Sequence, residues 1–89
     1  EGVILTEEQI ELFPNPTANT FRITCTIPEE LFNEFVVDVF DLQGNLVKHT
    51  TTSQNSDIDV SNWPSTIYVI QISNREQSFS VTKKLIKIE

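Results

Sequence analysis

The residues that could carry catalysis in this sequence are a single histidine, His49, and a single cysteine, Cys25. Nucleophilic catalysis needs a reactive side chain, a base that takes its proton and a group that orients the base. His49 falls at the end of a predicted strand, where a solvated imidazole is the ordinary outcome. Cys25 alternates with apolar residues on one strand face, which predicts a buried structural thiol. We therefore predict no catalytic residues and no enzymatic activity.

Carboxylates are the second group that could do chemistry. Asp57 and Asp59 alternate on one face of a short predicted strand, and such oxygen ligands can hold calcium. The ligand spacing of a calcium-binding loop is missing, which favours solvent-facing strand residues instead. Paired CxxC or HxxxH patterns are absent, and with Gly2 and Gly44 as the only glycines there is no glycine-rich phosphate loop. The sequence predicts no metal site and no cofactor.

The composition indicates one small domain with an excess of acidic residues. The chain has 89 residues, 38% of them hydrophobic and 21% charged, which suits a single globular core. Its formal net charge of −7 argues against nucleic acid or an anionic membrane as a partner. No segment resembles a membrane span or a signal peptide, and a lone cysteine cannot form an internal disulfide. Because methionine is absent, we expect a larger protein upstream.

The elements that must position these residues are strands. Alternating apolar residues and β-branched residues recur at intervals of about ten residues between turn signals, which is typical of a small sandwich or barrel. The predicted strands cover residues 10–13, 20–27, 34–41, 45–50, 57–60, 66–73 and 78–88. We expect residues 1–9 to be a linker remnant and residues 10–89 to form the domain.

Four local features follow from the residue types. Gly44 can adopt a positive φ between two apolar strands, which makes the turn at residues 43–44 the clearest hairpin. Residues 66–73 are apolar on both faces and should form a central strand. Trp63, which precedes a proline, is expected to plug the end of the core. In the last strand the apolar parity changes, which predicts a bulge or a frayed end near residues 83–84.

Four short phrases occur at strand-like intervals along the chain, and the later ones are built around a glycine turn, a Trp-Pro turn and a pair of lysines. Their residues are Phe13, Pro14, Asn15 and Pro16; Phe40, Asp41, Leu42, Gly44, Leu46 and Val47; Asp59, Ser61, Pro64, Ser65 and Tyr68; and Thr82, Lys83 and Lys84. In this order and combination they resemble the C-terminal sorting domain, type A, of the type IX secretion system (Por secretion system) of Bacteroidetes. Trp63 and Thr66 depart from the leucine and glycine usual in that family.

The resemblance extends over roughly residues 10–88, and it implies a fold and a role. The fold would be an immunoglobulin-like antiparallel β-sandwich of about seven strands, covalently fused to an upstream cargo. The type IX secretion machinery would recognise the domain in the periplasm and pass the cargo across the outer membrane to the cell surface or the medium. A sortase-like peptidase would then remove the domain, cutting in or before residues 1–9. The motif residues would be mainly structural, and the domain would not insert into a membrane.

The last strand is the part that we expect the secretion machinery to recognise. Its exposed backbone could pair with a receptor's sheet, and its lysines could orient the encounter with acidic partners. Alternatively, edge-strand lysines only discourage aggregation between sheets. The predicted recognition strip comprises Lys83, Lys84, Leu85, Ile86, Lys87 and Ile88. Without its receptor, this strand would favour a strand-exchanged dimer.

The alternative function comes from another class of protein. A fibronectin-type or carbohydrate-binding module of a surface adhesin or hydrolase would share the sandwich. Exposed aromatic residues in line on one sheet face would favour it. Trp63 and Tyr68 are the candidates, and we expect them to be too few and too buried for that role.

Overall fold

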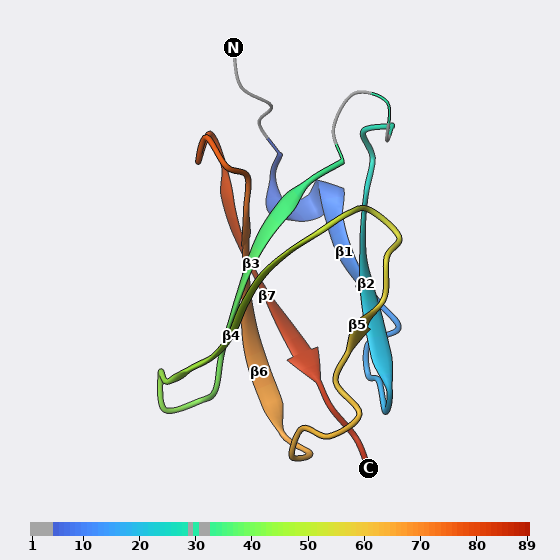
Figure 1. Ribbon diagram of the computed structural model, residues 1–89, viewed down its shortest axis with the longest axis vertical. Helices are drawn as coiled ribbons and strands as arrows, with labels where there is room; N and C mark the ends of the chain where they lie inside the picture. The colour runs from blue at the N-terminus through green and yellow to red at the C-terminus, as the bar shows by residue number, and fades with distance from the viewer. Residues whose placement is uncertain (1–4, 29, 31–32) are drawn as a thin grey trace.

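The chain folds into two antiparallel sheets that pack face to face (Figure 1). The computed structural model describes residues 5–28, 30 and 33–89. The smaller sheet has the order β1-β2-β5, formed by β1 (Ile10–Phe13), β2 (Thr20–Cys25) and β5 (Ile58–Asp59). The larger sheet has the order β4-β3-β6-β7, formed by β4 (Leu46–Thr52), β3 (Phe35–Phe40), β6 (Ile67–Ser73) and β7 (Ser80–Ile86). These seven strands confirm the predicted all-β sandwich.

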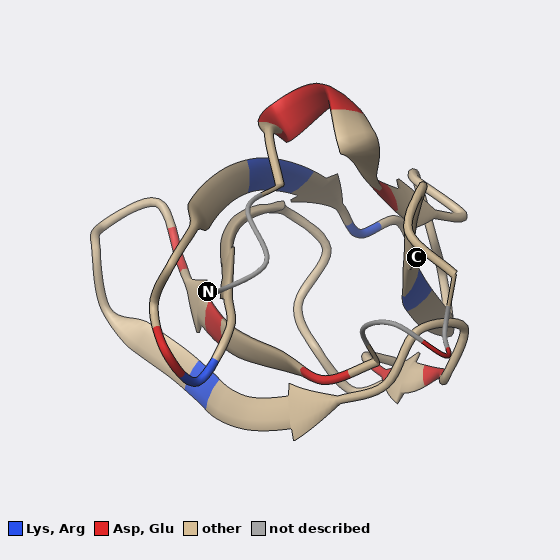
Figure 2. Cartoon of the chain, turned by 90° about the horizontal axis from the view of Figure 1, so that it is seen from above, with Lys and Arg blue, Asp and Glu red and all other residues tan. Residues whose placement is uncertain are grey.

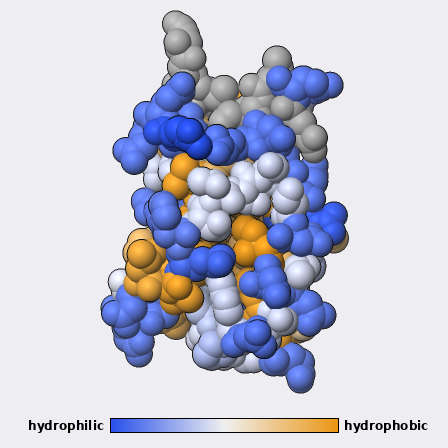
Figure 3. Space-filling view, viewed as in Figure 1, coloured by the Kyte–Doolittle hydropathy of each residue, from blue (hydrophilic) through white to orange (hydrophobic). Residues whose placement is uncertain are grey.

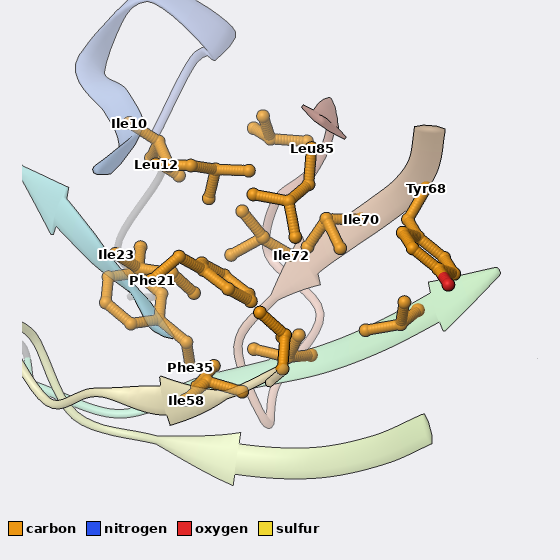
Figure 4. Close-up of a cluster of buried hydrophobic side chains, with 14 of the residues drawn as sticks. Ile10, Leu12, Phe21, Ile23, Phe35, Ile58, Tyr68, Ile70, Ile72 and Leu85 are labelled. Atoms are coloured by element: carbon orange, nitrogen blue, oxygen red, sulfur yellow. The ribbon is translucent and has the colours of Figure 1, made fainter. Parts of the chain in front are cut away.

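Alternation along the strands sends one set of side chains into a single core between the sheets (Figure 4). In β3, Phe35, Val37 and Val39 are fully buried, whereas the residues between them are partly exposed. From the opposite sheet, β2 contributes Phe21 and Ile23, which are also fully buried. Burial of each large apolar side chain stabilises the fold by about 1.5–3 kcal/mol. The inward faces of these strands are therefore the faces that period-2 alternation predicts.

The predicted hairpin and the predicted central strand are both confirmed. Gly44 has a φ of +89°, and its N–H donates to the carbonyl of Asp41 at 3.0 Å. β6 lies between β3 and β7 in the larger sheet, as expected for a strand that is apolar on both faces. The register of the β3–β4 pair shifts between Val39 and Phe40, so this hairpin contains the irregularity of the larger sheet.

The predicted bulge or frayed end near residues 83–84 is wrong. β7 pairs with β6 in continuous register along its whole length. Its inward parity also continues past the strand: Leu85 is fully buried and Lys87 is 2% exposed, while Ile86 and Ile88 point outward. The sequence pattern misled because a lysine occupies an inward position and isoleucines occupy outward ones.

Residues 5–9 pack onto the sandwich. Leu5 belongs to the core at 3% exposure, and a 3-10 turn, η1 (Glu7–Gln9), follows it and lies against β1 and β7. The N–H of Thr6 donates to Gln9 Oε1 at 2.9 Å and closes this turn. The division into a linker and a domain after residue 9 stays a prediction, and residues 1–4 lie outside the described part of the chain.

The two ends of the sandwich differ in what they contain. β1, β3, β5 and β7 all run toward the same end (Figure 1). The turns that follow β1, β3 and β5 therefore gather there with the last residues of the chain, and we call this the turn end. The opposite end contains η1 and the turn between β6 and β7, and we call it the η1 end. Among the described residues, no helix is long and apolar enough to cross a bilayer.

Candidate functional site

The four motif phrases, far apart in the sequence, meet at the turn end. The first occupies the turn after β1, the second the β3–β4 hairpin, the third the connection from β5 to β6, and the fourth runs along β7 toward the others. Backbone hydrogen bonds join the connections to each other: the N–H of Lys87 donates to the carbonyl of Thr66 at 2.9 Å, and that of Val60 to Asn19 at 2.8 Å. The β5–β6 connection is thus joined to both the turn after β1 and the last residues of the chain.

Asn15, between the two prolines of the first phrase, forms hydrogen bonds to the edge of β7 that faces away from β6. Its Nδ2 donates to the carbonyl of Lys84 at 2.7 Å, and its Oδ1 accepts from the N–H of Ile86 at 2.9 Å. An amide side chain here takes the place of a strand's backbone, since it offers one donor and one acceptor at strand-like spacing. The proline on each side donates no backbone hydrogen bond of its own.

Thr17 continues this edge as a short parallel partner of β7. Its N–H donates to the carbonyl of Ile86 at 2.9 Å, and its carbonyl accepts from the N–H of Ile88 at 2.9 Å. The expectation that the end of the last strand offers free backbone to a receptor is therefore wrong between Lys84 and Ile88. Those groups are already paired within the domain, and only side chains can be offered there.

The predicted recognition strip divides into an exposed and a buried set. Lys84, Ile86 and Ile88 are exposed, whereas Leu85 and Lys87 are buried. Lys83 is intermediate and lies on the inward-facing side of β7. Alternation thus places half of the strip on the outer surface of the larger sheet and the other half on its inward side, where Leu85 and Lys87 are buried.

Lys87 is a buried lysine that continues the apolar inward face. Its Nζ donates to the carbonyls of Ile88 and Glu89 at 3.3 Å and 3.4 Å. The hydrocarbon stem can lie against the core while the ammonium group reaches the last carbonyls of the chain. Lys87 therefore serves the packing of the turn end, and its charge is not presented outward.

Asp41 builds the β3–β4 hairpin. Its carboxylate accepts hydrogen bonds from the N–H of Asn45 at 2.9 Å and of Gln43 at 3.0 Å, and from Asn45 Nδ2 at 3.2 Å. These hydrogen bonds, chiefly the one from the Asn45 backbone, lower the pKa of Asp41. The carboxylate is ionised at neutral pH and committed to the turn, in keeping with a structural motif residue.

Tyr68 and Trp63 pack against each other beside the turn of the third phrase. The Tyr68 hydroxyl donates to the carbonyl of Pro64 at 2.8 Å, and its ring meets that of Trp63 edge-on with centroids 5.0 Å apart. Tyr68 is 3% exposed, and burial together with the nearby charge of Asp41 raises its pKa. Trp63 is half-buried against the core, which confirms the predicted plug. These rings pack against each other instead of forming an exposed row for a sugar.

A hollow of about 380 Å³ separates the β3–β4 hairpin from the turn that contains Pro64. Its lining comes from the second and third phrases and the residues beside them: Asp41, Leu42, Gln43, Val47, Pro64, Thr66 and Tyr68. Leu42 and Val47 are exposed at its rim. The hollow is therefore an open feature of the turn end with a mixed polar and apolar lining.

The residues considered for catalysis lie apart from this end. His49 and Asp38 face each other across β4 and β3 on the outer surface, with the His49 side chain 60% exposed. Cys25 is half-buried; its thiol donates to the carbonyl of Ile27 at 3.6 Å, and burial raises its pKa. The predicted structural role of Cys25 agrees with this position.

The carboxylates considered for calcium have other partners. Asp57 lies 3.4 Å from Arg22 Nε, and Asp59 accepts from the N–H of Ser61 at 2.9 Å, which lowers the pKa of Asp59. Over residues 5–28, 30 and 33–89, no three ligand-type side chains converge on one point. Viewed along the long axis, acidic and basic residues are distributed around the ring of strands (Figure 2).

Exposed apolar side chains at the turn end are a feature that the sequence reading missed. In the described part of the chain, the exposed large hydrophobic residues are Phe13, Leu42, Leu46, Val47, Ile86 and Ile88. All of them lie at the ends of β1, β3 and β7 or at the start of β4, and Figure 3 shows such a group beside the β3–β4 hairpin. Phe13 is partly covered by Arg22, whose guanidinium carbon lies 6.0 Å from the ring centre.

The fold defines the class of protein first: this is a small immunoglobulin-like β-sandwich domain whose turn-end polar groups hold its own turns and strand edges together. The sequence from residue 11 to residue 89 matches the family described as secretion system C-terminal sorting domain, and the chain belongs to that family. The family is that of the type IX secretion system, so the domain is a sorting signal that works with this machinery on a fused cargo destined for the cell surface or secretion. A search of curated proteins found no matching relative.

Proposed function

We propose that this domain directs a larger cargo, joined upstream of it, through the type IX system and across the outer membrane. One observation supports this role most directly: the motif phrases meet at the turn end, where Lys84, Ile86 and Ile88 are exposed beside them. A receptor that contacts this end would contact several motif phrases at once. That arrangement suits a sorting signal that is recognised in its folded form.

The exposed half of the recognition strip would make the contact. Lys84, Ile86 and Ile88 project outward, while Leu85 and Lys87 hold the strand against the core. Strand addition along the last residues is unavailable as long as Asn15 and Thr17 occupy that edge. Recognition would therefore depend on side chains displayed by a rigid strand end.

The remaining steps concern the route and the processing of the cargo. The cargo would pass through the periplasm, and a sortase-like peptidase would remove the domain afterwards, so that the domain is a substrate and not a catalyst. Residues 1–9 would connect the domain to the cargo, and a cut before Leu5 would leave the core intact. A strand-exchanged dimer would form only if the end of β7 left Asn15 and Thr17.

The function is tested by fusing residues 1–89 to a periplasmic reporter that carries its own signal peptide. In a bacterium with a type IX system, we expect the reporter at the cell surface. In a strain without the outer-membrane translocon, and for a fusion that lacks residues 83–89, we expect it in the periplasm. Equal surface delivery with and without the translocon would overturn the proposed function.

A second pair of variants separates recognition from folding, because removing residues 83–89 also removes buried Leu85. Lys84→Ser with Ile88→Ser changes two exposed residues of the strip. We expect severalfold less surface delivery at an unchanged melting temperature. The matched control is Glu8→Ser with Glu76→Ser, two exposed residues at the η1 end, which should be delivered normally. Normal delivery of both variants would contradict recognition through the strip.

A further inference from the structure

The outer face of the larger sheet is divided into two chemically different halves. The register of β4, β3, β6 and β7 arranges its outward side chains in rows across the sheet. The two rows toward the η1 end are Thr51, Val36, Ser73 and Ser80, followed by His49, Asp38, Gln71 and Thr82. The two rows toward the turn end are Leu46, Phe40, Val69 and Lys84, followed by Ile67 and Ile86. The first half is polar apart from one valine, and the second is apolar apart from one lysine.

The apolar half is accessible on the domain's surface. Leu46 and Ile86, at opposite edges of it, are 57% and 40% exposed, and Phe40, Ile67 and Val69 between them are partly exposed. Four strands at a spacing of about 4.8 Å make this half about 14 Å wide. A contiguous apolar patch on a small soluble domain usually marks an interaction site.

Lys84 is the one charged residue in the two apolar rows of this patch. It is exposed, and no ion pair joins it to any of the described residues. The nearest carboxylate in the adjacent outward row is Asp38, which is paired with His49. On a domain with a net charge of −7, an unpaired lysine at the edge of an apolar patch specifies where an acidic group of a partner can sit.

We propose that the apolar half of this sheet face, bounded by Leu46, Ile86 and Lys84, is a docking surface for a protein component of the secretion machinery. That component would present apolar side chains to the patch and an acidic group to Lys84. The inference rests on the proposed function and extends it, because the contact surface spans four strands instead of the terminal strip alone. An apolar centre with a polar edge is the usual composition of a specific protein interface. A second copy of this domain fits less well, since two acidic domains repel each other.

The test places the same charge on each half of the same two strands, in the complete cargo fusion. Leu46→Glu with Ile86→Glu introduces two carboxylates into the apolar half. The matched control, Thr51→Glu with Ser80→Glu, introduces two carboxylates into the polar half of β4 and β7, at positions that are also exposed and lie outside the motif phrases. We expect at least tenfold less surface delivery for the first variant and less than a twofold change for the control. Lys84→Glu should resemble the first variant, and Lys84→Arg should resemble the unchanged fusion.

The outcomes separate the docking surface from the proposed function and from misfolding. If the unchanged fusion is not delivered, the sorting function itself fails. If it is delivered, and both Glu variants are delivered equally well, the docking surface is wrong while the function stands. Thermal unfolding monitors folding, and if Leu46→Glu with Ile86→Glu unfolds, the milder Leu46→Thr with Ile86→Thr replaces it with the same expected loss.

Two further results would also overturn the assignment to a protein of the machinery. Differently tagged fusions that co-purify, and that separate in the Leu46→Glu with Ile86→Glu variant, would assign the patch to a second copy of the domain. Flotation of the fusion with phosphatidylcholine vesicles, lost in the same variant, would assign it to lipid. We expect neither co-purification nor flotation.

Discussion

The turn end and the η1 end of this sandwich differ in how far along the sequence their side-chain contacts reach. At the turn end, Asn15 bonds to Lys84 and Ile86, which are 69 and 71 residues away in the sequence. At the η1 end, local bonds close η1 and the β6–β7 turn, between Thr6 and Gln9 and between Asn74 and Ser78. Longer-range bonds there join Gln54 to Ile27 and Arg75 to Glu34, over 27 and 41 residues. The turn end therefore joins the first part of the chain to its last strand, whereas the contacts of the η1 end join segments that are closer in the sequence.

This difference bears on the function of a sorting signal. A surface assembled from remote segments exists only when the whole domain has folded, so a receptor that contacts it would distinguish folded domains from unfolded ones. The η1 end, next to the proposed connection with the cargo, has no such need. The comparison thus predicts that stability and delivery respond more strongly to changes at the turn end.

The largest expected effect is the loss of the Asn15 side chain. Asn15→Ala removes two hydrogen bonds to the edge of β7 and should lower the free energy of unfolding by about 2 kcal/mol. Gln9→Ala, the matched change at the η1 end, removes the 2.9 Å bond to the N–H of Thr6 and longer bonds to the hydroxyls of Thr6 and Thr26, and should cost about 1 kcal/mol. Urea unfolding of both variants measures the difference, and equal costs would remove the distinction between the ends.

The next effect concerns two of the turns in which a residue has a positive φ, one at each end of the sandwich. Gly44→Ala, at a φ of +89°, should destabilise the hairpin by about 1–2 kcal/mol, because an alanine is strained there although its methyl group would meet no atom within 4 Å. Gln77, at the η1 end, has a φ of +57°, so Gln77→Gly should be neutral or stabilise by a few tenths of a kcal/mol. Thermal unfolding checks the two signs, and stabilisation by Gly44→Ala would contradict this account of the hairpin.

A smaller effect is expected from the Tyr68 hydroxyl. Tyr68→Phe keeps the ring against Trp63 but removes the bond to the Pro64 carbonyl, which should cost about 1 kcal/mol. Near-ultraviolet circular dichroism should show the Trp63 environment retained while urea unfolding shows the loss. A change of both signals would mean that the hydroxyl also positions Trp63.

The smallest effect is a pH dependence at the hairpin. The pKa of Asp41 is lowered in the fold, so its contribution to stability is present above the unfolded pKa of about 3.9 and is lost as pH falls through the folded pKa. Asp41→Asn should therefore flatten the decline of the melting temperature between pH 5 and pH 2. The remaining decline is expected from Asp59, whose pKa is also lowered. An unchanged pH profile would show that Asp41 does not stabilise the hairpin through its charge.

Features that depend on neighbouring residues could be predicted from the sequence. The seven strands, the turn at Gly44 and the central position of β6 follow from alternation and turn chemistry, and the structure confirms them. The motif phrases also led to the correct family. Their convergence at one end follows once strands alternate in direction, because every second connection then lies at the same end.

Features that depend on remote contacts could not be predicted. Asn15 substitutes for a strand edge only because the fold brings it beside β7, and nothing near Asn15 in the sequence indicates that partner. From the sequence, Lys87 is expected at the surface. In the fold its side chain is buried on the inward side of the sheet, and its ammonium group donates to the carbonyls of Ile88 and Glu89. The contacts of Asn15 and Thr17 turned an expected free strand edge into a closed one.

The central claim, that the secretion machinery contacts the turn end and not the η1 end, is tested most directly by site-specific photocrosslinking. A photoreactive residue is placed at Ile86 or Leu46 at the turn end, or at Gln77 or Glu8 at the η1 end, in the cargo fusion during secretion. The account predicts crosslinks to a protein of the machinery from positions 86 and 46 and none from positions 77 and 8. Crosslinks of equal yield from both ends, or from the η1 end alone, would contradict it.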